Sequence, residues 1–113
     1  MARLSRVPRA SGPDGPILEQ LLRTLRDHLP ELREQYGVKS LAVFGSYVTG
    51  RRRKSSDLDL LVEFDEGTRM TFFRFVRLEQ HLSKLLDAKV DLVMKSALKP
   101  AIGERILAEV VPV

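Results

Sequence analysis

Two short apolar runs, separated by a polar segment, most narrowly restrict the fold that this chain can adopt. The first run covers residues 41–44 and the second covers residues 58–62. Apolar runs of this length that are bounded by turn-forming residues are typical of strands buried on both faces. We therefore predict strands over 38–44 and 58–64, joined by a polar connection that has room for one helical turn.

Helical periodicity precedes the first predicted strand. From Ile17 onward, leucines recur at helical spacing and form an apolar stripe. The stripe consists of Leu18, Leu21, Leu22, Leu25 and Leu29. Because Pro30 removes a backbone hydrogen bond from a helix interior, we predict that this helix ends or kinks near His28 or Leu29. A second short helix is predicted over 31–36.

Two further helices and a third strand are predicted in the second half of the chain. Thr71 suits the N-cap of a helix. The inward stripe of that helix would comprise Phe72, Phe75, Val76, Leu82 and Leu86. Residues 90–94 are typical of a strand, and Pro100 suits the first position of a last helix. The inward positions of the last helix would be Ile102, Ile106 and Val110. This order of elements predicts an α/β (α+β) domain in which helices pack against a small sheet.

The first sixteen residues differ in composition from the rest of the chain. They contain three prolines and two glycines and have little apolar content, a pattern typical of disorder. We therefore predict a disordered leader over 1–16 and a single domain over 17–113, which agrees with the length of 113 residues. A domain this short buries a smaller share of its surface than a large one, so assembly into a homo- or hetero-oligomer would add stability.

Composition excludes several classes of protein. The chain has no cysteine, which excludes disulfide frameworks and thiolate metal sites. The same absence fits a reducing, cytoplasmic compartment. No apolar run is long enough to span a membrane, so no membrane partner is expected.

The net charge of +4 has a local origin. The basic run 51–54 supplies four of the 19 basic residues, and without it 15 basic residues face 15 acidic ones. The protein is therefore not basic overall, and nucleic acid is not the expected partner. The run itself is interpreted either as a solvated loop or as a contact for phosphate or an acidic partner.

Two carboxylates stand at the start of the second predicted strand. Because side chains two residues apart on a strand point to the same side, Asp57 and Asp59 face one way. Two like charges about 4 Å apart repel by roughly 4 kcal/mol at an effective dielectric near 20. Such a pair is more often solvated when it stands alone, but the buried strand here favours a bound cation or a retained proton. Oxygen ligands in this arrangement suit Mg²⁺.

A third carboxylate, Asp91, interrupts the apolar strand 90–94. Considered alone, it would be a residue at a strand end or on an edge. If the second and third strands are neighbours, Asp91 joins Asp57 and Asp59. Three carboxylates can hold two metal ions roughly 3.5–4 Å apart, the arrangement used for in-line phosphoryl displacement.

A Gly-Ser pair directly follows the first predicted strand. Gly45 permits a sharp backbone turn and a close approach of phosphate, and Ser46 offers a hydroxyl and an amide donor. By itself the pair is equally an ordinary turn. Gly45 and Gly50 have the glycine spacing of a P-loop. Arg51 and Arg52 occupy the positions of its essential lysine and hydroxyl residue, which excludes that motif.

One segment of this chain resembles the signature of the polymerase-beta-type nucleotidyltransferases. The matching residues are the Gly45-Ser46 pair, then Ser56 and the Asp57-Leu58-Asp59 segment. The short length resembles the minimal nucleotidyltransferases, an antitoxin group paired with HEPN-domain proteins in prokaryotes. The resemblance covers residues 38–93 closely and the flanking helices loosely. It implies a small mixed sheet of three to four strands packed with helices, the polymerase-beta-like nucleotidyltransferase fold.

The resemblance also implies a role for each of these positions. Gly45 and Ser46 would hold the triphosphate of the nucleotide. Asp57 and Asp59 would ligate Mg²⁺. Asp91 matches the third carboxylate of the family, which assists a second metal ion and acts as base on the acceptor hydroxyl.

The loop before the aspartates departs from the family pattern. Ser56 matches the polar residue that precedes the first aspartate, and it would either support that carboxylate or end the loop. Many relatives have an acidic or proline-containing loop at this place, whereas residues 51–54 are basic. The resemblance therefore leaves the role of this run open.

The activity that the resemblance implies is metal-dependent nucleotidyl transfer, with ATP as substrate and two Mg²⁺ ions. AMP would pass to a hydroxyl acceptor, a tyrosine of a cognate HEPN toxin, so the chain would act as an antitoxin. A second hypothesis is a non-catalytic antitoxin that neutralises its HEPN partner by binding. Two more hypotheses are left open: modification of small molecules such as aminoglycosides, and nucleic-acid binding through residues 51–54.

Overall fold

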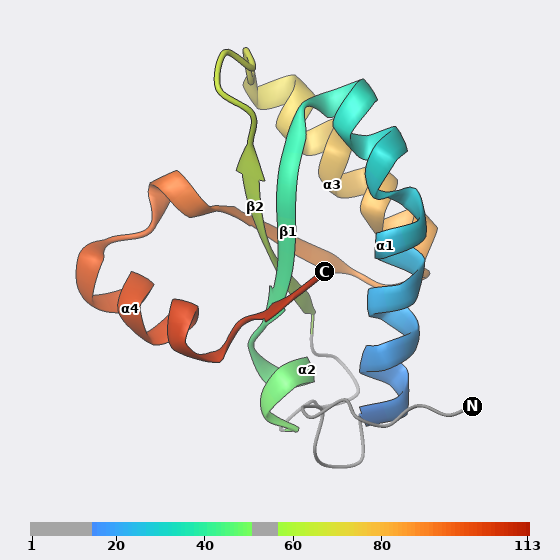
Figure 1. Ribbon diagram of the computed structural model, residues 1–113, viewed down its shortest axis with the longest axis vertical. Helices are drawn as coiled ribbons and strands as arrows, with labels where there is room; N and C mark the ends of the chain where they lie inside the picture. Colours follow the sequence, from blue (N-terminus) through green and yellow to red (C-terminus); the bar gives the residue numbers. More distant parts are fainter. Residues whose placement is uncertain (1–14, 51–56) are drawn as a thin grey trace.

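A mixed β-sheet forms the centre of the molecule in the computed structural model, which describes residues 15–50 and 57–113 (Figure 1). The strands are β1 (Val38–Phe44), β2 (Leu58–Phe64), β3 (Val90–Met94) and β4 (Val111–Pro112). Their spatial order is β3-β2-β1-β4. β1 pairs antiparallel with β2 and β4, whereas β2 and β3 run parallel. The three predicted strands are confirmed with their predicted bounds, and a short fourth strand completes the sheet.

The helices lie on both sides of this sheet. They are α1 (Gly15–Tyr36), α2 (Ser46–Thr49), α3 (Phe72–Leu86), the 3₁₀ turn η2 (Lys95–Ala97) and α4 (Pro100–Glu109). α1 and α3 lie side by side against one face, and α4 lies on the opposite side (Figure 1). α2 is the single helical turn expected in the connection between β1 and β2. In the part of the chain that the structure describes, no helix has the length and apolar character that a membrane crossing requires.

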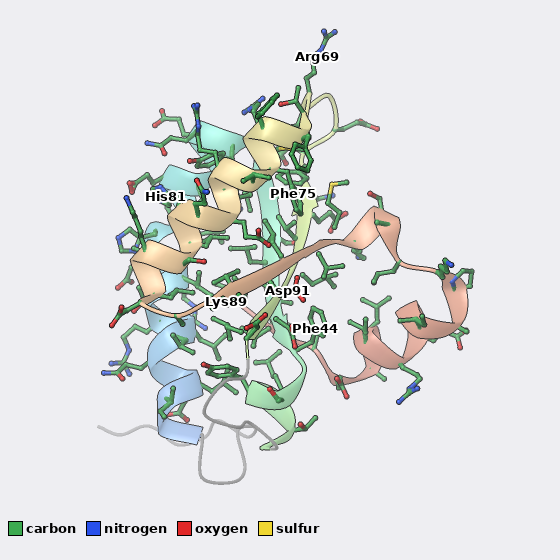
Figure 2. All side chains as sticks on the ribbon, turned by 180° about the vertical axis from the view of Figure 1, so that it is seen from behind. Phe44, Arg69, Phe75, His81, Lys89 and Asp91 are labelled. Atoms are coloured by element: carbon green, nitrogen blue, oxygen red, sulfur yellow. The ribbon has the colours of Figure 1, made fainter. Side chains whose placement is uncertain are left out.

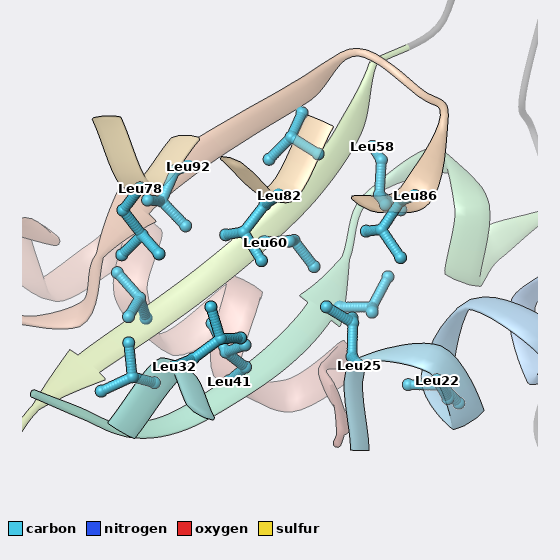
Figure 3. Packing of buried hydrophobic residues seen from close by; sticks show 14 of the residues in the cluster. Leu22, Leu25, Leu32, Leu41, Leu58, Leu60, Leu78, Leu82, Leu86 and Leu92 are labelled. Carbon is cyan, nitrogen blue, oxygen red and sulfur yellow. The ribbon is translucent and has the colours of Figure 1, made fainter. Parts of the chain in front are cut away.

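The main core lies between the sheet and the α1–α3 layer (Figure 3). Leu58, Leu60 and Val62 of β2 have exposed fractions of 0%, 0% and 1%. They pack with the leucines of α1 and α3 in one apolar cluster. Because side chains alternate along a strand, the residues between them point to the other face of the sheet. That second face carries Asp59.

The expected end of the first helix near His28 or Leu29, with a separate short helix over 31–36, is wrong, because α1 continues through Pro30 to Tyr36 as one helix. Leu18, Leu25 and Leu32 are fully buried, at 0% exposure each, and recur every two turns along one side of the helix. Proline in a helix interior costs about 3 kcal/mol, whereas burying Leu32 beyond it contributes roughly 1.5–3 kcal/mol, and Tyr36 is buried as well. The residues after Pro30 therefore stay helical because they pack on the sheet. The helix also begins at Gly15 rather than at Ile17, and residues 1–14 of the expected leader lie outside the described residues.

Two positions assigned to inward stripes are exposed instead. Phe72 is 76% exposed because the buried row of α3 consists of Leu78, Leu82 and Leu86, and Phe72 lies before that row at the first turn of the helix. Ile102 is 55% exposed. α4 instead buries Gly103, whose Cα would bring an added Cβ within 3.3 Å of the Leu98 side chain. A helix turns by about 100° per residue, so Ile102 points away from that contact.

Candidate active site

The turn after β1 forms one wall of the site. Gly45 has φ 80° and ψ −152°, a conformation essentially restricted to glycine. Its carbonyl accepts hydrogen bonds from the amides of Val48 and Thr49, at 3.0 Å each, and so starts α2. Tyr47, only 8% exposed, inserts into the core and anchors this turn. The chain thus reverses sharply at Gly45 and presents Ser46 next to the end of β1.

Asp59 of β2 lies directly against Gly45. Asp59 pairs with Phe44 across the antiparallel β1–β2 ladder, which places its side chain beside the residue that follows Phe44. A Cβ atom added at Gly45 would overlap the Asp59 Oδ2 atom and would lie 3.0 Å from its Cγ atom. The absence of a side chain at Gly45 is therefore what leaves room for the Asp59 carboxylate.

Asp91 lies beside Asp59 on the neighbouring strand. The two residues are register partners in the parallel β2–β3 ladder, so their side chains share the second face of the sheet. Asp57 precedes β2 directly and stands two residues before Asp59. Figure 2 shows Phe44 and Asp91 at the end of the sheet from which α2 begins, and the strand that carries Asp59 lies between theirs. The prediction that the strands carrying these carboxylates are neighbours is confirmed.

Burial, as the largest cause, together with the negative charges of Asp91 and Asp57 raises the pKa of the Asp59 carboxyl from 3.8 to about 6. Loss of solvation and like charges both disfavour the ionised form of a carboxylic acid. A half-buried carboxylate whose charge is unfavourable, on a strand and against a neighbouring turn, is a candidate for a functional site. Asp59 is therefore the carboxylate of this group whose ionised form is destabilised by its surroundings and by its two acidic neighbours.

The raised pKa predicts that the metal-free protein becomes more stable in mild acid. The folded state binds the Asp59 proton more tightly than the unfolded state, whose pKa is near 3.8. The Asp59 charge therefore destabilises the fold above pH 6, and this effect disappears as the pH falls from about 6 toward 3.8. Melting temperatures measured in chelator between pH 7.5 and pH 5 should rise more in the wild type than in Asp59→Asn. Identical profiles for the two proteins would contradict the raised pKa.

The oxygen donors of this group fit a hard divalent cation that shares its ligands with a substrate. Within residues 15–50 and 57–113, no three acidic or histidine side chains converge as a ready-made metal site. Mg²⁺ seldom uses such a closed cage, because it is usually held by one or two carboxylates together with substrate phosphates. Asp59 fits this mode, because a cation beside it would offset the negative charges of Asp91 and Asp57 and would favour the ionised form of its carboxyl.

The structure brings five of the six predicted site residues to one end of the sheet. These residues are Gly45, Ser46, Asp57, Asp59 and Asp91. Ser56 lies outside the described residues, and so does the basic run 51–54. The sequence reasoning missed two residues of α3, Glu79 and Ser83, which bind the backbone of β3 on either side of Asp91.

The fold and this site define a class of protein. The family described as "Nucleotidyltransferase domain" matches residues 25–112. The chain belongs to this family and is a nucleotidyltransferase.

Individual known proteins show how similar this chain is to other members of the family. The chain is 47% identical over 94 residues to protein adenylyltransferase MntA of Thermococcus cleftensis, an alignment that covers 83% of this chain and 93% of the relative. A solved structure provisionally described as a minimal nucleotidyltransferase is 38% identical, with a TM-score of 0.67 over 83% of this chain and 94% of that one. The complex of a tri-AMPylated Shewanella oneidensis HEPN toxin with an MNT antitoxin contains a chain of the same fold, with a TM-score of 0.54 at 21% identity. That match covers 88% of this chain and 70% of the other.

Proposed function

We propose that this protein transfers AMP from ATP to a tyrosine hydroxyl of a HEPN-domain toxin, and that it acts as the antitoxin of that toxin. The observation that carries the proposal is the position of Asp59, between the Gly45 turn and Asp91. The similarity to the protein adenylyltransferase of Thermococcus cleftensis supports AMP as the transferred group. The fold shared with an antitoxin bound to an AMPylated HEPN toxin supports the partner.

The proposed division of labour follows from where the residues lie. Gly45 and Ser46 would bind the triphosphate at the turn after β1. Asp57 and Asp59, with Asp91 beside them, would hold Mg²⁺. Bound Mg²⁺ would neutralise charge on the phosphates and activate the attacking oxygen. Ser56, which precedes Asp57 in the sequence, would support that carboxylate.

The proposed reaction needs only ATP, the tyrosine hydroxyl, bound Mg²⁺ and the carboxylates named above. The tyrosine oxygen attacks the α-phosphorus of ATP, a new O–P bond forms, and the bond to pyrophosphate breaks. The hydroxyl proton passes to the Asp91 carboxylate, which is exposed at the surface of the sheet and can release it to water. The protein contributes chiefly position and electrostatics, as in other phosphoryl transfers.

The reaction is tested by mixing the protein with Mg²⁺, ATP labelled in its α-phosphate, and a cognate HEPN-domain toxin. We expect label on the HEPN protein, loss of its toxicity, and no label after a tyrosine substitution in the acceptor. If no label moves while the complex still silences the toxin, the protein is an antitoxin that acts by binding. Transfer of the label to RNA or to a small molecule would exclude the HEPN acceptor.

The role proposed for Ser46 gives a prediction about substrate use. Replacing Ser46 with alanine should raise the KM for ATP about tenfold, because a hydrogen bond to a charged group contributes roughly 1.5–3 kcal/mol. The value of kcat should change much less, since the serine would bind the triphosphate equally in the ground state and the transition state. Ser40→Ala is the matched control, because Ser40 is exposed on β1 and bonds to Glu63 at 3.3 Å. Equal KM values for the two variants would remove Ser46 from the nucleotide site.

A further inference from the structure

The outer edge of β3 is bound by side chains of α3. β3 is an end strand of the sheet, and β2 pairs with it on one side only. On the other side, the Val90 amide donates to Ser83 Oγ at 3.1 Å and the Leu92 amide donates to Glu79 Oε2 at 2.9 Å. Both amides are therefore satisfied by the helix rather than by another strand. We call Glu79 and Ser83 the edge clamp.

The spacing of helix and strand explains why two side chains can do this. Glu79 and Ser83 are four residues apart, about 6 Å along a helix, and lie on the same side of it. Val90 and Leu92 are two residues apart, about 6.6 Å along a strand. The two distances nearly match, so consecutive turns of α3 meet alternate amides of β3. This correspondence fixes the position of β3 along its own axis.

Asp91 lies between the two clamped amides. Its side chain points to the second face of the sheet and is exposed, so its place depends mainly on its backbone. The flanking side chains of Val90 and Leu92 are buried, at 5% exposure each, and pack against the main core. Core packing and the edge clamp together leave the Asp91 backbone little freedom to shift relative to Asp59.

We propose that Glu79 and Ser83 are positioning residues for nucleotidyl transfer, which hold Asp91 beside Asp59. The proposal rests on the proposed function for its activity readout, but its physical content is independent of it. Neither residue lies on the Asp91 face of the sheet, and both act through the backbone of β3. Glu79→Ala should remove one support of Asp91, whereas Glu79→Gln keeps an oxygen that can accept from the Leu92 amide.

Four variants test the edge clamp: Glu79→Ala, Glu79→Gln, Ser83→Ala and the control Gln80→Ala, which changes the exposed neighbour on α3. We expect Glu79→Ala to lower kcat roughly tenfold or more and to weaken binding of Mn²⁺ alone by a similar factor, as loss of an outer support of a ligand does. The KM for ATP should change less than kcat. Glu79→Gln should recover most of the loss, Ser83→Ala should act in the same direction as Glu79→Ala, and Gln80→Ala should match the wild type.

Amide hydrogen exchange provides a measurement that does not depend on activity. The Leu92 amide should exchange faster in Glu79→Ala than in the wild type, and Glu79→Gln should restore its protection. If the exchange rate rises while kcat and Mn²⁺ affinity stay at wild-type values, the clamp is purely structural and the proposal is overturned. If Glu79→Ala does not alter Leu92 exchange, the clamp itself is absent. A wild-type protein that transfers no AMP would refute the proposed function, and Mn²⁺ affinity together with exchange would still decide the clamp.

Discussion

Replacing Asp59 with asparagine will abolish nucleotide transfer and leave a folded protein that is at least as stable as the wild type without metal. Asparagine has nearly the same size as aspartate, so the close fit against Gly45 is kept. The substitution removes the negative charge on which the proposed binding of Mg²⁺ depends, and the transition-state stabilisation lost is several kcal/mol, or about a thousandfold in rate. The same charge is disfavoured in the metal-free fold, because burial and two neighbouring carboxylates raise the Asp59 pKa to about 6.

Two measurements on Asp59→Asn must therefore move in opposite directions. Transfer of labelled AMP to the proposed HEPN acceptor reports activity, and the melting temperature in chelator at pH 7.5 reports stability. Asp65→Asn is the matched control, because Asp65 is exposed in the turn after β2. Its activity and melting temperature should equal those of the wild type. Full activity in Asp59→Asn would remove the metal from the mechanism, and a large drop in melting temperature would show that the carboxylate is structural.

The strands were predictable from sequence because short apolar runs end at turn residues in this chain. β1, β2 and β3 have their predicted bounds for this reason. Their order in space was not predictable from periodicity, which describes one element at a time. The parallel pairing of β2 with β3 is a tertiary contact, made possible by α3 crossing over the face of the sheet.

The predictions that were wrong concern helices, because tertiary packing there outweighed the local sequence preferences. Pro30 costs one backbone hydrogen bond, but Leu32 and Tyr36 beyond it bury their side chains against the core. Phe72 has the hydrophobicity of a core residue and a position before the buried row of α3. Periodicity indicates which side of a helix is apolar, and it does not indicate where that side loses contact with the sheet.

The residues of the candidate site likewise differ in whether sequence spacing or tertiary contacts bring them together. Asp57 and Asp59 share a strand, so sequence spacing alone placed them together. Asp91 lies beside them only because β2 pairs with β3, and sequence spacing could not establish that pairing. Glu79 and Ser83 gave no signal, because glutamate and serine on a helix usually face solvent. Their hydrogen bonds to β3 depend on its place at the edge of the sheet.

We expect the replacement of Gly45 with alanine both to displace Asp59 and to lower the stability of the whole domain. Gly45 has φ 80° and ψ −152°, and a side chain in this region costs about 1–3 kcal/mol. The new Cβ would also overlap Asp59 Oδ2, and overpacking of this kind costs a further 1–3 kcal/mol or so. We expect Gly45→Ala to lower the free energy of unfolding by about 4 kcal/mol. Transfer activity should be lost because Asp59 is pushed from its place.

A second glycine separates the two causes of this effect. Gly67 also has a positive φ, 88°, but a Cβ there would meet nothing within 4 Å. Gly67→Ala should therefore show the backbone cost alone and keep full activity. The excess cost in Gly45→Ala measures the contact with Asp59, and Asp59→Ala in the same chain should recover it, a positive coupling in a double-mutant cycle. Chemical denaturation of the four single and double variants gives these energies. If Gly45→Ala and Gly67→Ala cost the same and no coupling is found, the Asp59 carboxylate does not rest on the Gly45 turn, and the arrangement on which the proposed site depends is wrong.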